Sequence, residues 1–530
     1  MTTLRIAAAD NIKGSGLELL KKEFGADAVE VRGKYAPDEL LEKIGDLDAL
    51  LIRSGTTVTR AAIEKAGARL KLIGRAGVGT DNIDKKAATE KGIVVMNTPF
   101  GNTTSAAEQA LALIFTCARN TARADRLMHA GKWEKKDLVG AEVYEKTLGL
   151  IGMGRIGSHV AKVMTAAGMK IVAYDPFLSA DRARQIGVRL VTLDELAALA
   201  DFITIHTPLT DETRNLVNAA FIAKMKKGAR IVNCARGGII DETALAEAVK
   251  AGHLAGAGLD VFAQEPLAAD SPLIGVKNIL LTPHLGASTE EAEERCGWQM
   301  AEQVVAYFKR NEIINAVNLS ITHEKSLTAY VELAEKLAKI AATLLRGAPV
   351  AVEVNCRGEV FDGKDTGEIS AAAVIGVLEK SGLGGLNIVN ALSLAKERGL
   401  AVASGAQAPG PVYHHRVDVT LRSAEVTTVV GGTVSGDRTF RLIRLDDADI
   451  DMRLGKHLLF LRYPDTPGYV GKFGTLIGEA GVNIEHMEVG ALESRQRASM
   501  TIAIDQPATD DLLKKLLAVG GVEKAFYCKL

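Results

Sequence analysis

The chain lacks the cysteine pattern, the aromatic content and the charge imbalance that mark several specialised protein classes. Its five cysteines are scattered and form no CxxC pair, which excludes a disulfide framework and a thiolate zinc site. Aromatic residues make up only 5% of the chain, so its cores must consist mainly of Ala, Val, Leu and Ile. With 64 basic and 65 acidic residues the formal net charge is −1, which leaves no excess charge to attract nucleic acid or an anionic membrane.

Long apolar runs are also lacking. No window approaches the roughly 18 uninterrupted apolar residues of a membrane span, and the first residues show no signal-peptide pattern, so we expect a cytoplasmic protein. Length and glycine, by contrast, are abundant. A chain of 530 residues is too long to fold around a single hydrophobic core, so we expect several domains. The 52 glycines predict many tight turns.

Up to residue 310, short apolar runs alternate with amphipathic stretches, which predicts buried parallel strands connected by helices. The strands of a first series are expected at 4–10, 48–54, 70–77 and 92–97, and those of a second near 148–151, 170–174, 202–205, 229–233, 256–260 and 279–281. Long helices are expected at 103–129, in a position to bridge two lobes, and at 290–310. The predicted fold class is therefore α/β, with two doubly wound, Rossmann-like parallel sheets.

A glycine-rich turn follows the strand expected at 148–151. The residues Gly152-Met-Gly154-Arg-Ile-Gly157 lead into a helix, and Asp175 ends the next strand at about the spacing of 20 residues that dinucleotide-binding folds show. The first glycine permits a tight turn, the second lets the backbone approach a pyrophosphate, and the third lets helix and strand pack closely. Because Asp175 can accept both ribose hydroxyls and would repel a 2′-phosphate, the sequence predicts binding of NAD rather than NADP.

Three ionisable residues follow later strands of the same series. Arg236, Glu265 and His284 each lie just after an expected strand, at the edge where such sheets bind ligands. An imidazole moves protons near neutral pH, a neighbouring carboxylate fixes its tautomer, and a guanidinium grips a carboxylate with two donors. Each residue alone is more typical of a surface or loop position, but together they predict acid–base chemistry on a hydroxy acid.

The sequence around these residues resembles the NAD-dependent D-2-hydroxyacid dehydrogenases. The motifs that carry the resemblance are VNCARGG at 232–238, LDVFAQEP at 259–266, TPHLG at 282–286, and RSGTTVT, RAGVGTDNID and NTPFGNTTSAAE earlier in the chain. The resemblance implies that Arg236, Glu265 and His284 are catalytic. It implies that substrate is contacted by Arg53, Gly55, Arg75, Gly77, Asn102, Arg236 and His284. It further implies that the cofactor is contacted by Gly152, Gly154, Arg155, Ile156, Gly157, Asp175, Thr207, Pro208, Cys234, Ala235, Asp260 and Gly286.

The rest of the chain resembles the long-form branch of that family. Residues 320–454 occupy the place of an α+β intervening domain, and residues 455–530 have the β-α-β-β-α-β order of a regulatory ACT domain. In front of them we predict a substrate-binding lobe (1–98 and 290–319) and an NAD-binding domain (99–289). The resemblance implies oxidation of 3-phospho-D-glycerate to 3-phosphohydroxypyruvate with NAD, the first step of L-serine synthesis. It also implies a homo-oligomer, either a dimer or a tetramer.

Feedback control by L-serine is a further implication of the resemblance. ACT domains pair across a subunit interface and hold an amino acid there, and the residues expected to contact it are Tyr463, Asp465 and Asn483. Some family members have His and Asn where this chain has Tyr463 and Asp465. The alternative is that these are ordinary loop residues in a domain that only dimerises.

Two alternatives stay open for the function. The first alternative is another D-2-hydroxyacid dehydrogenase, acting on 2-hydroxyglutarate, glycerate or hydroxypyruvate. The second is a binding protein that senses NAD without catalysis. The remaining histidines lack the carboxylate or cysteine spacing of a metal site, so no metal is expected. Lys132, Lys135 and Lys136, around Trp133, are expected to be solvated.

Overall fold

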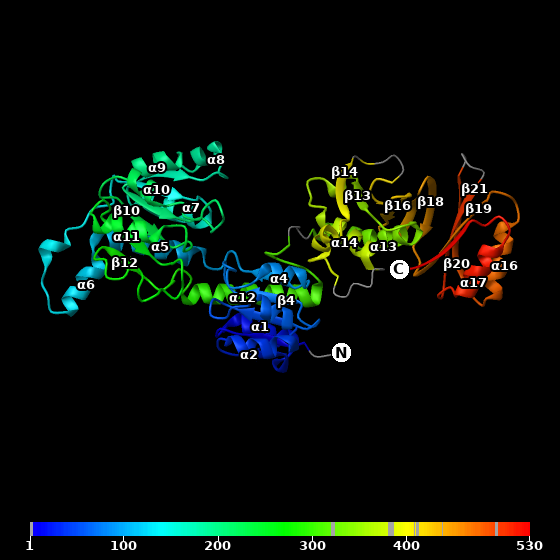
Figure 1. The fold of residues 1–530 in the computed structure, drawn as a ribbon, viewed down its shortest axis with the longest axis horizontal. Coiled ribbons are helices and arrows are strands. Elements are labelled where there is room, and N and C mark those ends of the chain that lie inside the picture. The colour runs from blue at the N-terminus through cyan, green and yellow to red at the C-terminus, as the bar shows by residue number, and fades with distance from the viewer. Residues whose placement is uncertain are drawn as a thin grey trace.

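The computed structural model describes residues 4–319, 324–379, 386–407, 409, 413–436, 438–492 and 497–530. Within these residues the chain folds around four β-sheets that follow one another along the sequence. Figure 1 shows an elongated molecule with the second sheet at one end, the first in the middle, and the third and fourth toward the other end.

The first sheet has five parallel strands in the spatial order β2-β1-β3-β4-β5. The strands are β1 (Ile6–Ala8), β2 (Val29–Val31), β3 (Ala49–Ile52), β4 (Leu72–Arg75) and β5 (Val94–Asn97), and the helices around them are α1 (Ser15–Phe24), α2 (Pro37–Lys43), α3 (Arg60–Lys65), α4 (Lys85–Glu90) and α12 (Glu290–Arg310). Buried side chains of α1 and α12 pack on one face, and those of α2, α3 and α4 pack on the other. Because both faces are covered, β3 and β5 are buried at every position.

The second sheet has seven parallel strands in the spatial order β12-β11-β10-β9-β6-β7-β8. They are β6 (Thr147–Ile151), β7 (Lys170–Tyr174), β8 (Arg189–Leu190), β9 (Phe202–Ile205), β10 (Arg230–Asn233), β11 (Gly256–Leu259) and β12 (Ile279–Leu281). The helices are α5 (Thr103–Arg119) and α7 (Arg155–Ala166) on one face, α9 (Leu193–Leu199), α10 (Ala219–Lys224) and α11 (Glu242–Lys250) on the other, and α8 (Ala180–Gln185) before β8. The strand order reverses between β6 and β9, which is where doubly wound sheets form their ligand crevice.

The third sheet is mixed and the fourth is antiparallel. The third comprises β13 (Ala351–Arg357), β14 (Ala401–Gln407), β15 (Arg416–Arg422), β16 (Thr427–Val434), β17 (Phe440–Leu445) and β18 (Ala448–Arg453), with α13 (Thr328–Leu344), α14 (Gly367–Leu378) and α15 (Ala391–Glu397). The fourth comprises β19 (His457–Pro464), β20 (Ile484–Leu492), β21 (Arg497–Ile504) and β22 (Lys524–Lys529), with α16 (Tyr469–Glu479) and α17 (Asp510–Ala518). The order β-α-β-β-α-β expected for the last part of the chain is the order observed.

The fold class expected from the sequence is confirmed, because both N-terminal sheets are parallel and doubly wound. The prediction of a single helix over 103–129 is wrong in one respect, because the helix breaks at Asn120 into α5 and α6 (Thr121–His129). Asn120 has a φ of 55°, and its side-chain amide donates to the carbonyl of Val139 at 3.1 Å. Asparagine tolerates this left-handed conformation, so the chain turns out of the helix there. Residues 121–144 form an arm that projects from the second lobe (Figure 1).

The third sheet is connected by packing to its neighbours on both sides. Along β19, Leu458 and Phe460 belong to the core around α13, whereas Leu459 and Leu461 belong to the core under α16 and α17. The alternation of a strand therefore places one face of the fourth sheet against the intervening region. On the other side, the amide of Asn387 donates to the carbonyl of Gly92 at 2.7 Å, so the same region also docks on the first lobe.

The described residues contain neither a membrane-spanning helix nor a cluster of metal-binding side chains. No helix in this part of the chain is long and apolar enough to cross a membrane. The described histidine, cysteine, aspartate and glutamate side chains do not gather anywhere in a group of three or more suited to a metal ion.

Candidate active site

The three glycines between β6 and α7 have three different surroundings. Gly152 has a φ of 95°, and a Cβ there would lie 2.7 Å from the carbonyl oxygen of His206. A Cβ on Gly157 would overlap the carbonyl oxygen of Gly152, so helix α7 packs this closely only with glycine at that position. A Cβ on Gly154 would meet no atom within 4 Å. The open side of the turn therefore lies at the N-terminus of α7, whose free N–H groups suit a diphosphate.

Asp175 is tied to the same turn. Its carboxylate accepts hydrogen bonds from the N–H groups of Met153 at 2.7 Å and Phe177 at 2.8 Å. Thr207, after β9, flanks Gly152, and its hydroxyl oxygen is buried with no hydrogen-bond partner among the described residues. An orphaned hydroxyl beside an open turn fits a ligand that supplies the missing partner, so the residues present suit a dinucleotide.

The other expected cofactor contacts lie near the same edge of the sheet. Arg155 begins α7, and its guanidinium carbon lies 3.7 Å from the centroid of the Phe100 ring, which follows β5. Ile156 is partly buried against the core under α7, and Pro208 is exposed after β9. Cys234 and Ala235 follow β10, and burial raises the pKa of the Cys234 thiol. Cys234 is therefore a neutral packing group rather than a nucleophile.

His284 and Glu265 form a direct pair. The Nδ1 atom of His284 lies 2.7 Å from Oε2 of Glu265. Burial by itself would raise the pKa of the Glu265 carboxyl, but hydrogen bonds from His284 and from the N–H of Phe262, together with the charge of Arg236, hold that pKa below its usual range. Glu265 is therefore an ionised acceptor, so Nδ1 of His284 carries a proton. The other ring nitrogen, Nε2, is the one that can exchange a proton with a ligand.

A buried carboxylate fixes the loop that carries His284. Asp260, which follows β11 and is 0% exposed, accepts hydrogen bonds from the N–H groups of Leu285 and Gly286, both at 2.8 Å, and from the hydroxyl of Thr282 at 2.6 Å. These bonds hold His284 at a φ of 55°, a conformation that costs a non-glycine residue about 1–3 kcal/mol. Asp260 is expected to contact the cofactor; in the structure it also accepts from Nε2 of Gln109 on α5 at 3.3 Å, and its other side-chain bonds go to the histidine loop. Gly286 is buried against this carboxylate.

Arg75 ends β4 in the first lobe and is close to Arg236. Burial lowers the pKa of its guanidinium to about 10, and repulsion from Arg236 and Arg53 adds to the effect, so Arg75 is still charged at neutral pH. Its Nε is buried with no hydrogen-bond partner among the described residues. Gly77 has a φ of 154° and lies directly against this guanidinium, where a Cβ would overlap Nη1. The arrangement leaves a buried, incompletely paired cation, which suits an anionic ligand.

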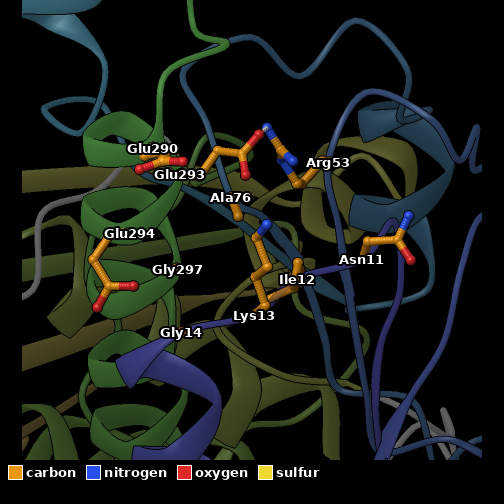
Figure 2. Close-up of a pocket in the computed structure, with 10 residues that line it drawn as sticks. All are labelled: Asn11, Ile12, Lys13, Gly14, Arg53, Ala76, Glu290, Glu293, Glu294 and Gly297. Atoms are coloured by element: carbon orange, nitrogen blue, oxygen red, sulfur yellow. Dashed lines mark ion pairs between the residues drawn. The ribbon is translucent and has the colours of Figure 1, made fainter.

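Arg53, expected to face the cleft, is already held by a carboxylate. Its Nη2 lies 2.9 Å from Oε1 of Glu293 in the first turn of α12. Figure 2 shows the two side chains meeting at the edge of a cavity. The cavity has a volume of about 300 Å³, and Lys13 and Glu290 also line it. Arg53 can therefore offer a substrate its remaining N–H groups, and its full fork only after it leaves Glu293.

Asn102 and Gly55 complete the expected substrate contacts. Asn102 precedes α5 at the N-cap position, yet its side chain does not cap the helix, and Oδ1 is buried with no partner among the described residues. Gly55 lies in the turn after β3, where a Cβ would be 2.9 Å from Oδ1 of Asp10. The free amide oxygen of Asn102 is thus available to a ligand hydroxyl.

The three expected effector contacts differ in exposure. The Tyr463 side chain is 3% exposed, and its ring packs on Tyr469 and Phe473 with centroids 4.9 and 5.1 Å apart. Burial, together with the nearby charge of Asp465, raises the pKa of Tyr463. Asp465 and Asn483 are exposed at the end of β19 and before β20. The Tyr463 ring is thus part of the core under α16, because alternate residues of β19 face that helix, and a contact of Tyr463 with an effector stays a prediction.

Three family models match the chain in order. They are the D-isomer specific 2-hydroxyacid dehydrogenase, NAD binding domain (residues 111–286), the D-3-phosphoglycerate dehydrogenase intervening domain (326–446) and the ACT domain (457–521). A D-3-phosphoglycerate dehydrogenase from Synechocystis is 41% identical over 100% of this chain and 95% of the relative, and one from Archaeoglobus fulgidus is 38% identical over 99% and 100%. The chain belongs to the D-3-phosphoglycerate dehydrogenase family. As a member of this family it is an oxidoreductase, and its cofactor is NAD.

Solved structures similar to this chain cover its first two lobes. A formate dehydrogenase from Staphylococcus aureus in complex with NAD has a TM-score of 0.53 and 31% identity, over 59% of this chain and 98% of its own. A D-lactate dehydrogenase from Aquifex aeolicus, complexed with NAD and lactic acid, has a TM-score of 0.52 and 28% identity, over 58% and 96%. The two-lobed dehydrogenase architecture is thus common to this family and its neighbours.

Sequence reasoning missed two acidic residues of the site. Asp81 pairs with Arg236, and Glu293 pairs with Arg53. Asp81 lies inside the RAGVGTDNID motif, and Glu293 lies in a run of glutamates at the start of α12, so both residues belong to segments that the sequence analysis singled out. Neither pairing was predictable, because each partner is more than a hundred residues away in the sequence.

Proposed function

We propose that the protein oxidises 3-phospho-D-glycerate to 3-phosphohydroxypyruvate with NAD, as the first step of L-serine synthesis. Relatives that carry the name of this activity align over essentially the full chain. The observation that carries the proposal is the His284–Glu265 pair, 2.7 Å apart and close to Arg236, on the same sheet edge as the glycine turn.

Three residues divide the chemistry on the substrate. Nε2 of His284 accepts the proton of the C2 hydroxyl during oxidation and returns it during reduction. Glu265 accepts from Nδ1, which keeps the ring in one tautomer and stabilises the positive charge that the ring gains. Arg236 grips the carboxylate and the C2 oxygen with its planar fork. The glycine turn and Asp175 would hold the diphosphate and ribose of NAD, which would supply the acceptor for the hydride of C2.

The phosphate of the substrate requires a further cation, and Arg75 fits this role. It is buried and charged, its Nε has no hydrogen-bond partner in the described part of the chain, and it is repelled by two neighbouring arginines. A dianion placed here would relieve that repulsion and supply acceptors. Arg53 would join it after leaving Glu293, and Asn102 would contact a substrate hydroxyl.

A panel of 2-oxo acids tests the proposal. NADH oxidation is measured at equal concentrations of 3-phosphohydroxypyruvate, hydroxypyruvate, glyoxylate and 2-oxoglutarate. We expect kcat/KM for 3-phosphohydroxypyruvate to exceed that for hydroxypyruvate by about 100-fold, the effect of one charged, bidentate contact. Comparable values would favour another D-2-hydroxyacid dehydrogenase, and no turnover with any member would favour an NAD-sensing binding protein.

Regulation and assembly extend the proposal. The ACT domain supports an amino-acid effector, which we propose to be L-serine, bound at Asp465 and Asn483 between two copies of the chain. Such a site requires a homo-oligomer, a dimer or a tetramer. We also propose that the protein works in the cytoplasm, where five unpaired cysteines stay reduced.

A further inference from the structure

Arg236 extends from the second lobe to a carboxylate of the first. Its Nε donates to Oδ2 of Asp81 at 3.0 Å, and its Nη1 donates to the carbonyl of Ala235 at 2.7 Å. No hydrogen bond holds Nη2 within the described residues. Two of the five N–H groups of the guanidinium are thus used, and the second N–H of Nη1 and both of Nη2 are available to a ligand.

The backbone of the first lobe approaches this guanidinium closely. A Cβ on Gly79 would overlap Nη2 of Arg236 and would lie 3.1 Å from Oδ2 of Asp81. Glycine at position 79 therefore lets the arginine of one lobe lie against the backbone of the other. Besides the ion pair, the close approach to the Gly79 backbone also places the Arg236 and Asp81 side chains together.

The loop that carries Asp81 is itself fixed to the substrate-binding strands. The side-chain amide of Asn82 donates to the carbonyls of Arg53 at 2.8 Å and Thr56 at 2.7 Å, and that of Asn97 donates to the carbonyl of Val78 at 2.6 Å. These bonds join the loop to the ends of β3 and β5. Asp81 is therefore a fixed point of the first lobe, beside the arginines expected to bind the substrate.

We infer that Asp81 is a positioning residue, whose carboxylate sets the Arg236 fork against the substrate-binding lobe and offsets the repulsion between Arg236 and Arg75. The inference rests on the proposed function, because the fork is taken to grip the substrate carboxylate. The Asp81 side chain is 71% exposed, so the pair adds little to folding stability. Its effect falls on substrate binding, since a fork held in one orientation loses less freedom when a ligand binds.

The inference is tested with Asp81→Asn, which removes the charge at constant size, and Asp81→Glu, which restores it. Asp38→Asn, an exposed carboxylate on α2 of the same lobe, is the matched control. We measure the dissociation constant of 3-phospho-D-glycerate for the NADH-loaded protein by calorimetry, because this pair cannot react. Asp81→Asn should weaken this binding and raise KM for 3-phosphohydroxypyruvate by about tenfold, the effect of one charge-assisted hydrogen bond. Asp81→Glu should recover part of the loss.

Two measurements separate positioning from a merely structural role. The unfolding temperature and the dissociation constant of NADH should match those of the control variant. In a double-mutant cycle with Arg236→Lys, the loss caused by Asp81→Asn should shrink to less than about twofold, because the positioned fork is gone.

An equal loss in both backgrounds would overturn the inference, as would unchanged substrate binding in Asp81→Asn. If the unmodified protein bound and reduced none of the 2-oxo acids, the proposed function would fail first, and this inference with it.

Discussion

At the scale of single residues, the proton chemistry depends on a histidine held in an uncommon backbone conformation. His284 has a φ of 55°, and its ring is 2.7 Å from Glu265. We predict that His284→Gln lowers kcat by at least about 100-fold, the usual contribution of a positioned acid–base group, and leaves the dissociation constant of NADH unchanged. NADH oxidation and NADH fluorescence titration measure the two quantities. His129→Gln, on exposed α6, is the control, and a kcat within threefold of the unmodified protein would remove His284 from the mechanism.

The partner of this histidine gives a pH-dependent prediction. The pKa of Glu265 is lowered, so its negative charge and the stability that it contributes are present above the ordinary carboxyl value of about 4.3 and are lost as the pH falls through the lowered value. The same carboxylate accepts from Nδ1 of His284, which leaves Nε2 to donate the proton in reduction. Glu265→Gln should therefore lower kcat/KM for reduction and remove the part of the acid-induced fall in unfolding temperature that protonation of this carboxyl causes. Equal falls in unfolding temperature between neutral and acid pH in the two proteins would contradict this pairing.

The residues of the site were predictable where they directly follow a predicted strand. Arg236, Glu265 and His284 follow β10, β11 and β12, and parallel strands bring their carboxyl ends to one edge. Contacts between lobes were not predictable in this way, as Asp81 and Glu293 show, because strand periodicity does not fix how two sheets face each other. The roles of these residues in turnover stay predictions.

At the scale of elements, the turn between β6 and α7 separates two functions of glycine. Gly154 is at the N-cap of α7 with a φ of −64°, which alanine can adopt, and a Cβ there has open space. Gly154→Ala should therefore keep the unfolding temperature and weaken NADH binding by about tenfold, since the methyl group occupies the approach to the diphosphate. Gly157→Ala should lower the free energy of unfolding by about 1–3 kcal/mol, because its Cβ overlaps the carbonyl of Gly152. Thermal unfolding with and without NADH distinguishes the two variants, and equal unfolding temperatures would contradict the assignment.

Most strands were predictable because buried parallel strands are continuous apolar runs. The expected ranges contain nine of the strands, which are β1, β3, β4, β5, β7, β9, β10, β11 and β12. The edge strands β2 and β8 were missed, since they are short and partly exposed. The break at Asn120 was missed for a different reason. A helix-compatible sequence continues through it, and contacts with the returning arm favour the turn, among them the bonds of the asparagine amide and the bond from the N–H of Ala141 to the carbonyl of Ala118 at 2.8 Å.

At the scale of the whole molecule, the arm formed by residues 121–144 exposes apolar side chains that a single copy does not cover. Trp133 and Val139 are each 81% exposed, whereas Tyr144, 62% exposed, already lies with its ring against Gly168 of the lobe. Large exposed groups gathered on one projection are typical of an interface. We predict that Trp133→Glu lowers the oligomer mass measured by light scattering, whereas Ile274→Glu, which changes an exposed side chain elsewhere in the same lobe, does not. An unchanged mass in Trp133→Glu would remove the arm from the interface.

The shared core between the last two domains gives the ACT domain a mechanical connection to the rest of the chain. Leu458 and Phe460 of β19 pack into the core around α13, and Asn387 joins that region to the first lobe. An effector bound at the ACT domain changes catalysis only if it binds two arrangements of these contacts with different affinity, and the coupling is then reciprocal. We therefore predict that L-serine inhibits the enzyme. 3-Phospho-D-glycerate should weaken serine binding by the same factor as serine weakens substrate binding. Asp465→Asn should abolish the heat of serine binding in calorimetry. Asp510→Asn, which removes an exposed carboxylate from α17, should leave that heat intact. If titration of the unmodified protein gave no heat with L-serine and the rates stayed constant, the ACT domain would act in assembly alone.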